Sequence, residues 1–265
     1  MEYIDKLGGI AVSLLETLRT NAGTGNAKIG LHILKAMVRQ GDIVSGQVYV
    51  IGGEAEQKID EVTISVMTTV SVNEGERKVM QDAEIQNCSL TNSFRILPKE
   101  EKTVPFSLKL SPETPLTIHK VDVWLKTALK TERGKEEIDE HDIHVVGTEA
   151  AEKILAALHE LDFPLKKAAN IRSDLTHSGV VQELEFYPSH KFERHFTVLQ
   201  LALISDSVGT TAYIKLVREG KNQKHLLGHK TQGADSKTLL HYRYGNVPDK
   251  KEIYQQLLHH LTSKT

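Results

Sequence analysis

The chain has 265 residues and a mass of 29.6 kDa, which favours two modest domains over a single large one. Hydrophobic residues make up 39% of it, charged residues make up 26%, and the net charge at pH 7 is −2. These values exclude a wholly disordered or fibrous chain and predict no basic surface for nucleic acid. The single cysteine, Cys88, excludes an intramolecular disulfide.

The N-terminal segment has the spacing of an amphipathic helix over about residues 3–19. Its acidic residues, Glu2 and Asp5, do not resemble a secretory signal, and no apolar run reaches spanning length, so the cytoplasm is the expected location. Acidic residues also disfavour an anionic membrane. We therefore expect the apolar stripe to dock on its own chain or a dimer mate, ahead of a separate partner or a membrane. The candidate partner-binding residues are Ile4, Leu7, Leu14 and Leu18.

From residue 27 to about residue 146 the apolar period changes from helical to two. Val62, Ile64 and Val66 alternate with polar residues, and the stretches 104–110 and 121–125 do the same. Strands joined by Gly, Pro and Asn turns are typical of an antiparallel sandwich.

The pair Gly52-Gly53 connects two of these predicted strands. A phosphate loop would need a helix after the glycines, whereas Glu54 and Glu56 follow here and would repel phosphate. A simple strand connection is therefore predicted.

A helix over residues 148–161, with Thr148 as its N-cap, separates the two halves. Strand patterns return at 184–186, 199–203, 212–216 and 240–244, and a last helix is predicted over 249–261. We therefore predict an N-terminal domain over residues 1–147 and a C-terminal β-rich domain over residues 148–265.

The acidic and histidine-rich segment 136–144 suggests a second hypothesis. If it is extended, Glu140, Asp142 and His144 share one face and provide ligands for a divalent metal, as in a metal-dependent hydrolase. Histidines of the second half offer further ligands. Adjacent like charges more often form a solvated strand edge. No nucleophile motif is present, so no catalytic, cofactor or metal residue is assigned.

Several stretches, in their order along the chain, resemble the bacterial sporulation-control (SpoOM) family. They cover most of the sequence as far as residue 205. They are GTGNAKI (23–29), GDIVSGQVYVIGGEAEQKIDEVTISVMTT (41–69), FRILPKEEKTVPFSLKLSPETPLT (94–117), VDVWLKTAL (121–129), ILAALHELDFPLKKAAN (154–170), VVQELEFYP (180–188) and FERHFTVLQLALIS (192–205).

The resemblance implies a mainly β protein with two arrestin-like antiparallel β-sandwich domains and short N-terminal, inter-domain and C-terminal helices. It also implies a non-enzymatic regulator or adaptor in the control of sporulation onset or cell-stage processes, with protein partners and a homodimer as an alternative. No cofactor, nucleic acid or integral membrane segment is expected. A sugar- or lipid-binding sandwich is a third hypothesis, which an aromatic content of 5% disfavours.

Overall fold

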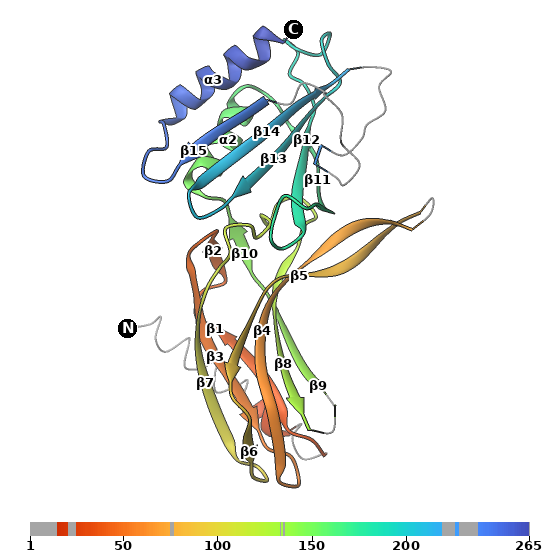
Figure 1. Cartoon of the computed structure of the whole chain (residues 1–265), viewed down its shortest axis with the longest axis vertical. Coiled ribbons are helices and arrows are strands. Elements are labelled where there is room, and N and C mark those ends of the chain that lie inside the picture. The colour runs from red at the N-terminus through yellow and green to blue at the C-terminus, as the bar shows by residue number, and fades with distance from the viewer. Residues whose placement is uncertain are drawn as a thin grey trace.

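A computed structural model shows a long molecule in which two bodies are stacked end to end (Figure 1). The structure describes residues 15–20, 25–74, 77–132, 134, 136–218, 226–227 and 238–264. We call the part that contains β1 to β10 the lower body and the part from α2 to α3 the upper body.

The lower body consists of strands in two facing layers. One layer has the strand order β1-β3-β7, and the other contains the order β5-β4-β8-β9. The short strands β2 and β10 pair in parallel near the upper body. The bounds are β1 (Lys28–Ile33), β2 (Met37–Arg39), β3 (Ile43–Ile51), β4 (Gln57–Glu74), β5 (Arg77–Thr91), β6 (Phe94–Ile96), β7 (Glu101–Lys109), β8 (Val123–Thr131), β9 (Glu136–Asp142) and β10 (His144–Val146).

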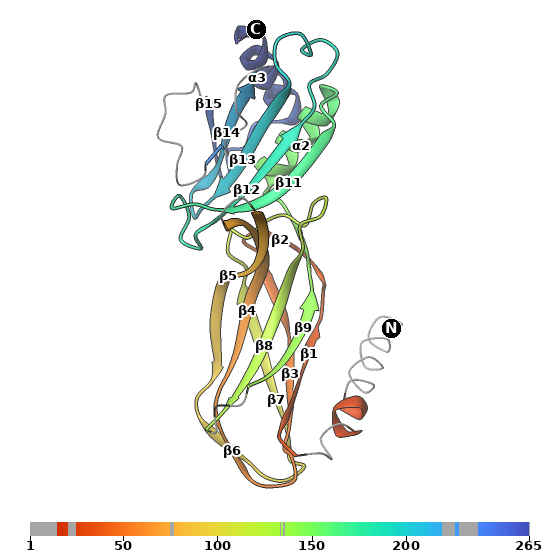
Figure 2. The ribbon, with the colours of Figure 1, turned by 90° about the vertical axis from the view of Figure 1, so that its right-hand side faces the viewer.

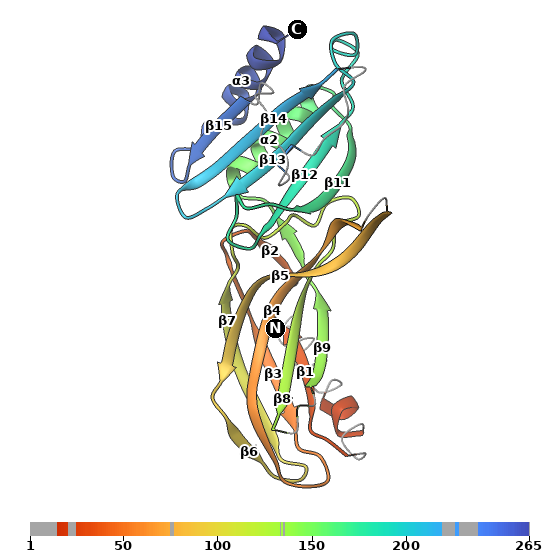
Figure 3. The same cartoon turned by 45° about the vertical axis from the view of Figure 1, so that its right-hand side comes forward.

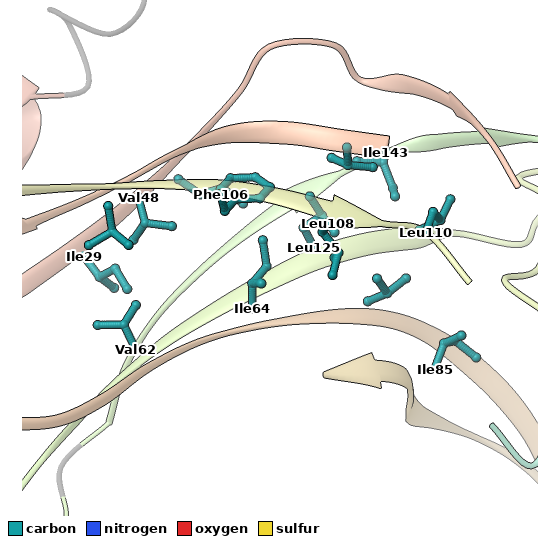
Figure 4. Packing of buried hydrophobic residues seen from close by; sticks show 14 of the residues in the cluster. Ile29, Val48, Val62, Ile64, Ile85, Phe106, Leu108, Leu110, Leu125 and Ile143 are labelled. Atoms are coloured by element: carbon teal, nitrogen blue, oxygen red, sulfur yellow. The ribbon is translucent and has the colours of Figure 1, made fainter. Parts of the chain in front are cut away.

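Alternating apolar residues on both layers build the lower core. Val62 and Ile64 on β4 are fully buried, as the period-two pattern predicts, and they point toward Val48 on the opposite layer (Figure 4). Leu125 on β8 extends the same core. Each layer therefore buries one face against the other, which is the arrangement of a sandwich.

The connection at Gly52-Gly53 lies where three backbone segments meet. A Cβ atom on Gly52 would lie 2.0 Å from the Leu97 carbonyl oxygen, and one on Gly53 would lie 2.0 Å from the Gly25 carbonyl oxygen. The Gly52 N–H donates to the carbonyl of Glu100 at 2.8 Å. The pair therefore joins β3 to β4, as predicted, and glycine is needed for the close approach of the backbones.

In the upper body, helices cover one face of a single antiparallel sheet with the order β15-β14-β13-β12-β11 (Figure 2). Thr148 and Asp249 cap the two helices, and Ile154 and Leu257 are buried on their apolar faces. Helices thus take the place that a second sheet would have in a sandwich. The bounds are α2 (Glu149–Glu160), β11 (Leu165–Arg172), β12 (Val180–Phe186), β13 (Val198–Ser205), β14 (Gly209–Val217), β15 (Thr238–Arg243) and α3 (Lys250–Ser263).

The two bodies are joined by a strand contact and by buried hydrogen bonds. Ile171 on β11 pairs in parallel with Ser71 on β4, so one sheet continues from one body into the other. The Asn170 side-chain amide donates to the Thr68 hydroxyl at 2.8 Å and to the Thr69 carbonyl at 3.0 Å. Residue 170 is 1% exposed, so these bonds lie in the interior of the joint.

A second set of bonds lies at the loop between β7 and β8. The Glu113 carboxylate accepts hydrogen bonds from the backbone N–H groups of His177 at 3.1 Å and Ser178 at 3.0 Å. The Gln182 amide exchanges two hydrogen bonds with the backbone of Leu116. These bonds fix the angle between the bodies.

The prediction of a mainly β chain with antiparallel sheets and helices at both ends and in the middle is confirmed. Helix α2, helix α3 and the strands from β12 to β15 lie where the patterns place them. The arrestin-like character and the exact division at residues 147 and 148 stay predictions. Strands β5 and β11 were not predicted.

Candidate interaction surfaces

Residues 15–20 form a helical segment that docks on the outer side of the β1-β3-β7 layer. Leu18 is buried against Tyr49 and Ile51. The Arg19 guanidinium donates to both carboxylate oxygens of Glu101, at 2.5 and 3.0 Å. This hydrogen bond, together with the charge of Arg19, holds the pKa of Glu101 below its usual value against a smaller effect of burial. The contacts that attach the segment thus include the buried Leu18, the partly buried Leu15 and one exposed ion pair.

The structure places one of the four candidate partner-binding residues. Leu18 lies against its own chain, whereas Ile4, Leu7 and Leu14 lie outside the described residues. Binding of a partner by these four residues therefore stays a prediction.

The acidic segment 136–144 contains all of edge strand β9 and the first residue of β10, and the two faces of β9 differ. The inner face closes the open side of the sandwich against β1. The Asp139 carboxylate accepts a hydrogen bond from the backbone N–H of Leu31 at 2.6 Å, and Glu137 pairs with Lys28 at 3.0 Å. Because β1 and β9 are not paired through their backbones, these side chains connect the two layers.

Two histidines lie at the same edge. His141 Nε2 is 3.3 Å from Asp139 Oδ2, and this hydrogen bond raises the pKa of His141. Burial alone would raise the pKa of Asp139, but the hydrogen bonds from His141 and Leu31 outweigh it and lower that pKa. His32 is 8% exposed, and its Nδ1 has no hydrogen-bond partner among the described residues. Burial, and secondarily His141, lower its pKa.

The metal hypothesis for this segment is not supported. Glu140 and Asp142 share the exposed face of β9, but His144 belongs to β10, which pairs with β2. Among the second-half histidines, His190 contacts Glu193 at 3.1 Å on the surface, and the pair at 225 and 229 lies outside the described residues. Within the described ranges no group of three His, Cys, Asp or Glu residues could hold a metal ion.

The surface on the solvent side of β5-β4-β8-β9 is called the outer face here. Pairing across the four strands aligns its residues in rows, and Trp124 and Met67 lie side by side near one end. Ile138 lies two rows away on edge strand β9 and is 46% exposed. The rows are Glu84-Met67-Trp124-Asp142, Asn87-Ser65-Lys126-Glu140, Ser89-Thr63-Ala128-Ile138 and Glu61-Lys130-Glu136.

Hydrogen bonds hold the polar side chains of the outer face in place. The Ser65 hydroxyl donates to Glu84 at 2.8 Å, and the Asn87 amide donates to Ser65 at 2.7 Å and to Glu84 at 3.2 Å. The sequence contains a signal for part of this surface, because Trp124 lies between two inward-facing residues, Val123 and Leu125. The rows themselves depend on pairing between distant strands.

Among the described residues, no helix is both long and apolar enough to cross a membrane.

Comparison with known proteins gives consistent matches over most of the chain. A family model described as SpoOM protein matches residues 15–220. The sporulation-control protein spo0M of Bacillus subtilis (strain 168) is 26% identical over 249 residues, which are 93% of this chain and 96% of that protein. The crystal structure of Spo0M from Bacillus subtilis matches with a TM-score of 0.84 at 25% identity, over 91% of this chain and 100% of that chain. Since the family model covers more than half of the sequence, the chain belongs to the SpoOM protein family.

Proposed function

We propose that this protein is a cytoplasmic regulator or adaptor without enzymatic activity, which binds other proteins in the control of sporulation onset or cell-stage processes. Membership of the SpoOM family, together with the match to a sporulation-control protein over 93% of this chain, supports a role in sporulation control. The structural feature that supports the binding of other proteins is the outer face of β5-β4-β8-β9.

The outer face has the composition of a recognition surface. Trp124 and Met67 are partly exposed and provide an apolar contact, and tryptophan is enriched among the residues that contribute most to protein binding. The hydrogen bonds among Ser65, Glu84 and Asn87 fix polar groups beside them. A surface whose side chains are already ordered loses less entropy when a partner binds.

The charge of the outer face indicates the chemistry of the partner. Its rows contain five carboxylates, but only two lysines. We therefore expect a protein segment that presents Lys or Arg residues around an apolar side chain. The carboxylates are Glu61, Glu84, Glu136, Glu140 and Asp142, and the lysines are Lys126 and Lys130.

The test compares wild type with a charge-reversed variant, Glu140→Lys with Asp142→Lys, in native cells that lack the chromosomal copy. We expect the amount of protein cross-linked to the variant to be at least about fivefold lower than for wild type, because like charges now oppose the basic segment. We also expect the variant to fail to restore the normal timing of sporulation or cell stages. Lys251→Glu, an exposed change on α3, is the control.

Circular dichroism and thermal unfolding establish that each variant is folded. If the folded variant retains both the partners and the timing of wild type, the outer face is not the binding surface. If deletion of the gene changes neither sporulation nor cell-stage timing, the proposed function is wrong.

A further inference from the structure

A small cavity lies in the joint between the two bodies. The loop between β7 and β8 lies at the top of the lower body (Figure 3), and the backbone of Leu116 in this loop bonds to the Gln182 side chain on β12. The cavity beside this contact has a volume of about 20 Å³. A water molecule needs about 10 to 15 Å³, whereas a site for an organic ligand needs several hundred. The residues that line the cavity come from both bodies and include Gln40, Glu113, Thr114, Val181, Gln182 and Leu203.

The Thr114 hydroxyl is a buried polar group without a partner in the wall of this cavity. Thr114 is 0% exposed, and its Oγ1 has no hydrogen-bond partner among the described residues. Its backbone is bonded on both sides, because its N–H donates to the Ser111 carbonyl at 3.0 Å and its carbonyl accepts from the Gln40 side-chain amide at 2.6 Å. These bonds keep the residue away from bulk solvent. A buried hydroxyl without a partner destabilises the folded state, and an ordered water commonly satisfies such a group.

The other walls of the cavity provide acceptors. Gln182 is 8% exposed, and its side-chain oxygen accepts one hydrogen bond, from the Leu116 N–H at 3.1 Å. An amide oxygen has two acceptor positions, so one is left for a further donor. The Glu113 carboxylate accepts three hydrogen bonds from His177 and Ser178, and a carboxylate has about four acceptor positions. The cavity walls therefore offer one donor and two acceptors.

We propose that this cavity binds one ordered water molecule, which accepts a hydrogen bond from the Thr114 hydroxyl and donates to the Gln182 side-chain oxygen and the Glu113 carboxylate. Three hydrogen bonds are the usual number for a buried water. The water satisfies Thr114 and connects the β7–β8 loop of the lower body to strand β12 of the upper body. A small cation is not favoured, because the one carboxylate in the wall is already bonded to three N–H groups.

The water makes solvent a part of the joint. Asn170 joins the two bodies by direct hydrogen bonds to Thr68 and Thr69, whereas Thr114 reaches Gln182 through the water. A water-mediated bond of this kind is almost as favourable in enthalpy as a direct one. The contact between the bodies at the β7–β8 loop therefore depends on one hydroxyl group. This inference concerns the joint alone and does not depend on the proposed function.

Crystallography and oxygen-17 relaxation dispersion on the full chain test the site. At a resolution that shows ordered solvent, we expect a water oxygen within about 3 Å of both Thr114 Oγ1 and Gln182 Oε1. Oxygen-17 dispersion counts the water molecules that stay bound for longer than the protein takes to rotate. We expect Thr114→Val, which replaces the hydroxyl with a methyl group of similar size, to retain one such water fewer than wild type. Thr114→Ser keeps the hydroxyl and therefore the water.

The matched control is Thr127→Val on β8. Thr127 is also 0% exposed, but its hydroxyl donates to the Asp139 carbonyl at 3.2 Å, and it does not line the cavity. This variant loses a buried hydroxyl as Thr114→Val does, and we expect it to retain the same number of long-lived waters as wild type.

The thermal midpoint gives a second measurement, because the sign of its change depends on whether the cavity holds water. With the water bound, Thr114→Val removes a satisfied hydrogen bond, and we expect the midpoint to fall by about 2 to 4 °C. In a dry cavity the same variant removes an unsatisfied polar group, so the midpoint would stay the same or rise.

Three results overturn the proposal. They are a crystal structure without a water oxygen at hydrogen-bond distance from Thr114 Oγ1, an equal number of long-lived waters in wild type and Thr114→Val, and a midpoint of Thr114→Val that is unchanged or raised. Each is read after circular dichroism has established the wild-type fold.

Discussion

Asp139 determines how the open side of the sandwich is closed. A free strand edge normally satisfies its N–H groups with water or with a further strand. Here the Asp139 carboxylate accepts from the Leu31 N–H at 2.6 Å across the gap between the two layers. The acidic segment thus has a structural role on its inner face, while its outer carboxylates contribute to the charge of the outer face.

His32 predicts how stability at this edge depends on pH. Burial lowers its pKa in the folded chain below the usual 6.5, so between those two values the unfolded chain binds more protons and stability falls as the pH falls. His141, whose pKa is raised, contributes in the opposite sense, with stability that is lost as the pH rises through its folded pKa. We expect His32→Leu to become more stable relative to wild type as the pH decreases from 7.5 to 5, in urea unfolding at each pH.

The matched control for this measurement is His144→Leu, because His144 is exposed on β10. Both variants retain Asp139 and His141, so the difference between their pH profiles isolates the buried imidazole. If the stability difference between wild type and His32→Leu is the same at every pH from 7.5 to 5, the pKa of His32 is not lowered in the folded chain.

The helical segment 15–20 is an element attached by few contacts. Leu18→Ala removes most of its apolar contact with Tyr49 and Ile51 and costs about 2 kcal/mol of local stability. We expect tryptic cleavage after Arg19 to become at least about tenfold faster, because local opening of the segment becomes more frequent. The thermal midpoint of the remaining chain stays close to that of wild type.

Leu175→Ala is the control for this cleavage, since Leu175 is 52% exposed in a loop of the upper body. If Leu18→Ala and Leu175→Ala are cleaved at the same rate, Leu18 does not attach the segment.

The helices and strands that can be predicted from the sequence are those with a clear apolar periodicity or a clear capping residue of their own. Val62 to Val70 alternate cleanly on β4, and Thr148 and Asp249 mark the starts of both helices. Strand β5 was missed because a register shift opposite Val66 and Met67 interrupts its alternation and much of it is polar on both sides. Strand β11 contains lysine, alanine and asparagine, which favour no strand, and its neighbours β12 and β4 hold it in place.

The outer face could be predicted only in part. Trp124 points outward because Val123 and Leu125 point inward, which the sequence pattern contains. Its position beside Met67 requires the pairing of β8 with β4, more than fifty residues away along the chain. Contacts of this kind depend on strand register, which a local pattern does not determine.

At the scale of the whole molecule, two separate cores share one continuous sheet. One large apolar cluster fills the lower body and includes Val180 from β12, and another lies between the upper sheet and its helices. A smaller cluster around Val181 and Ala202 also belongs to the upper body. Each core could unfold alone, but the pairing of β4 with β11 and the buried bonds of Asn170 couple them. The orientation of the outer face relative to the upper body is therefore fixed by this strand pairing and by buried polar residues of the joint.

Asn170 provides the test of this coupling. Asn170→Leu removes the bonds to Thr68 and Thr69 and leaves the Thr69 carbonyl without its side-chain donor, at a cost of about 1 to 3 kcal/mol. Because this loss lies in the joint, we expect wild type to unfold in a single calorimetric transition and Asn170→Leu to unfold in two, one for each core. Asn87→Leu, which removes bonds within the outer face only, shifts the transition without splitting it. A single transition for Asn170→Leu would mean that the cores are coupled mainly by the strand pairing of β4 and β11.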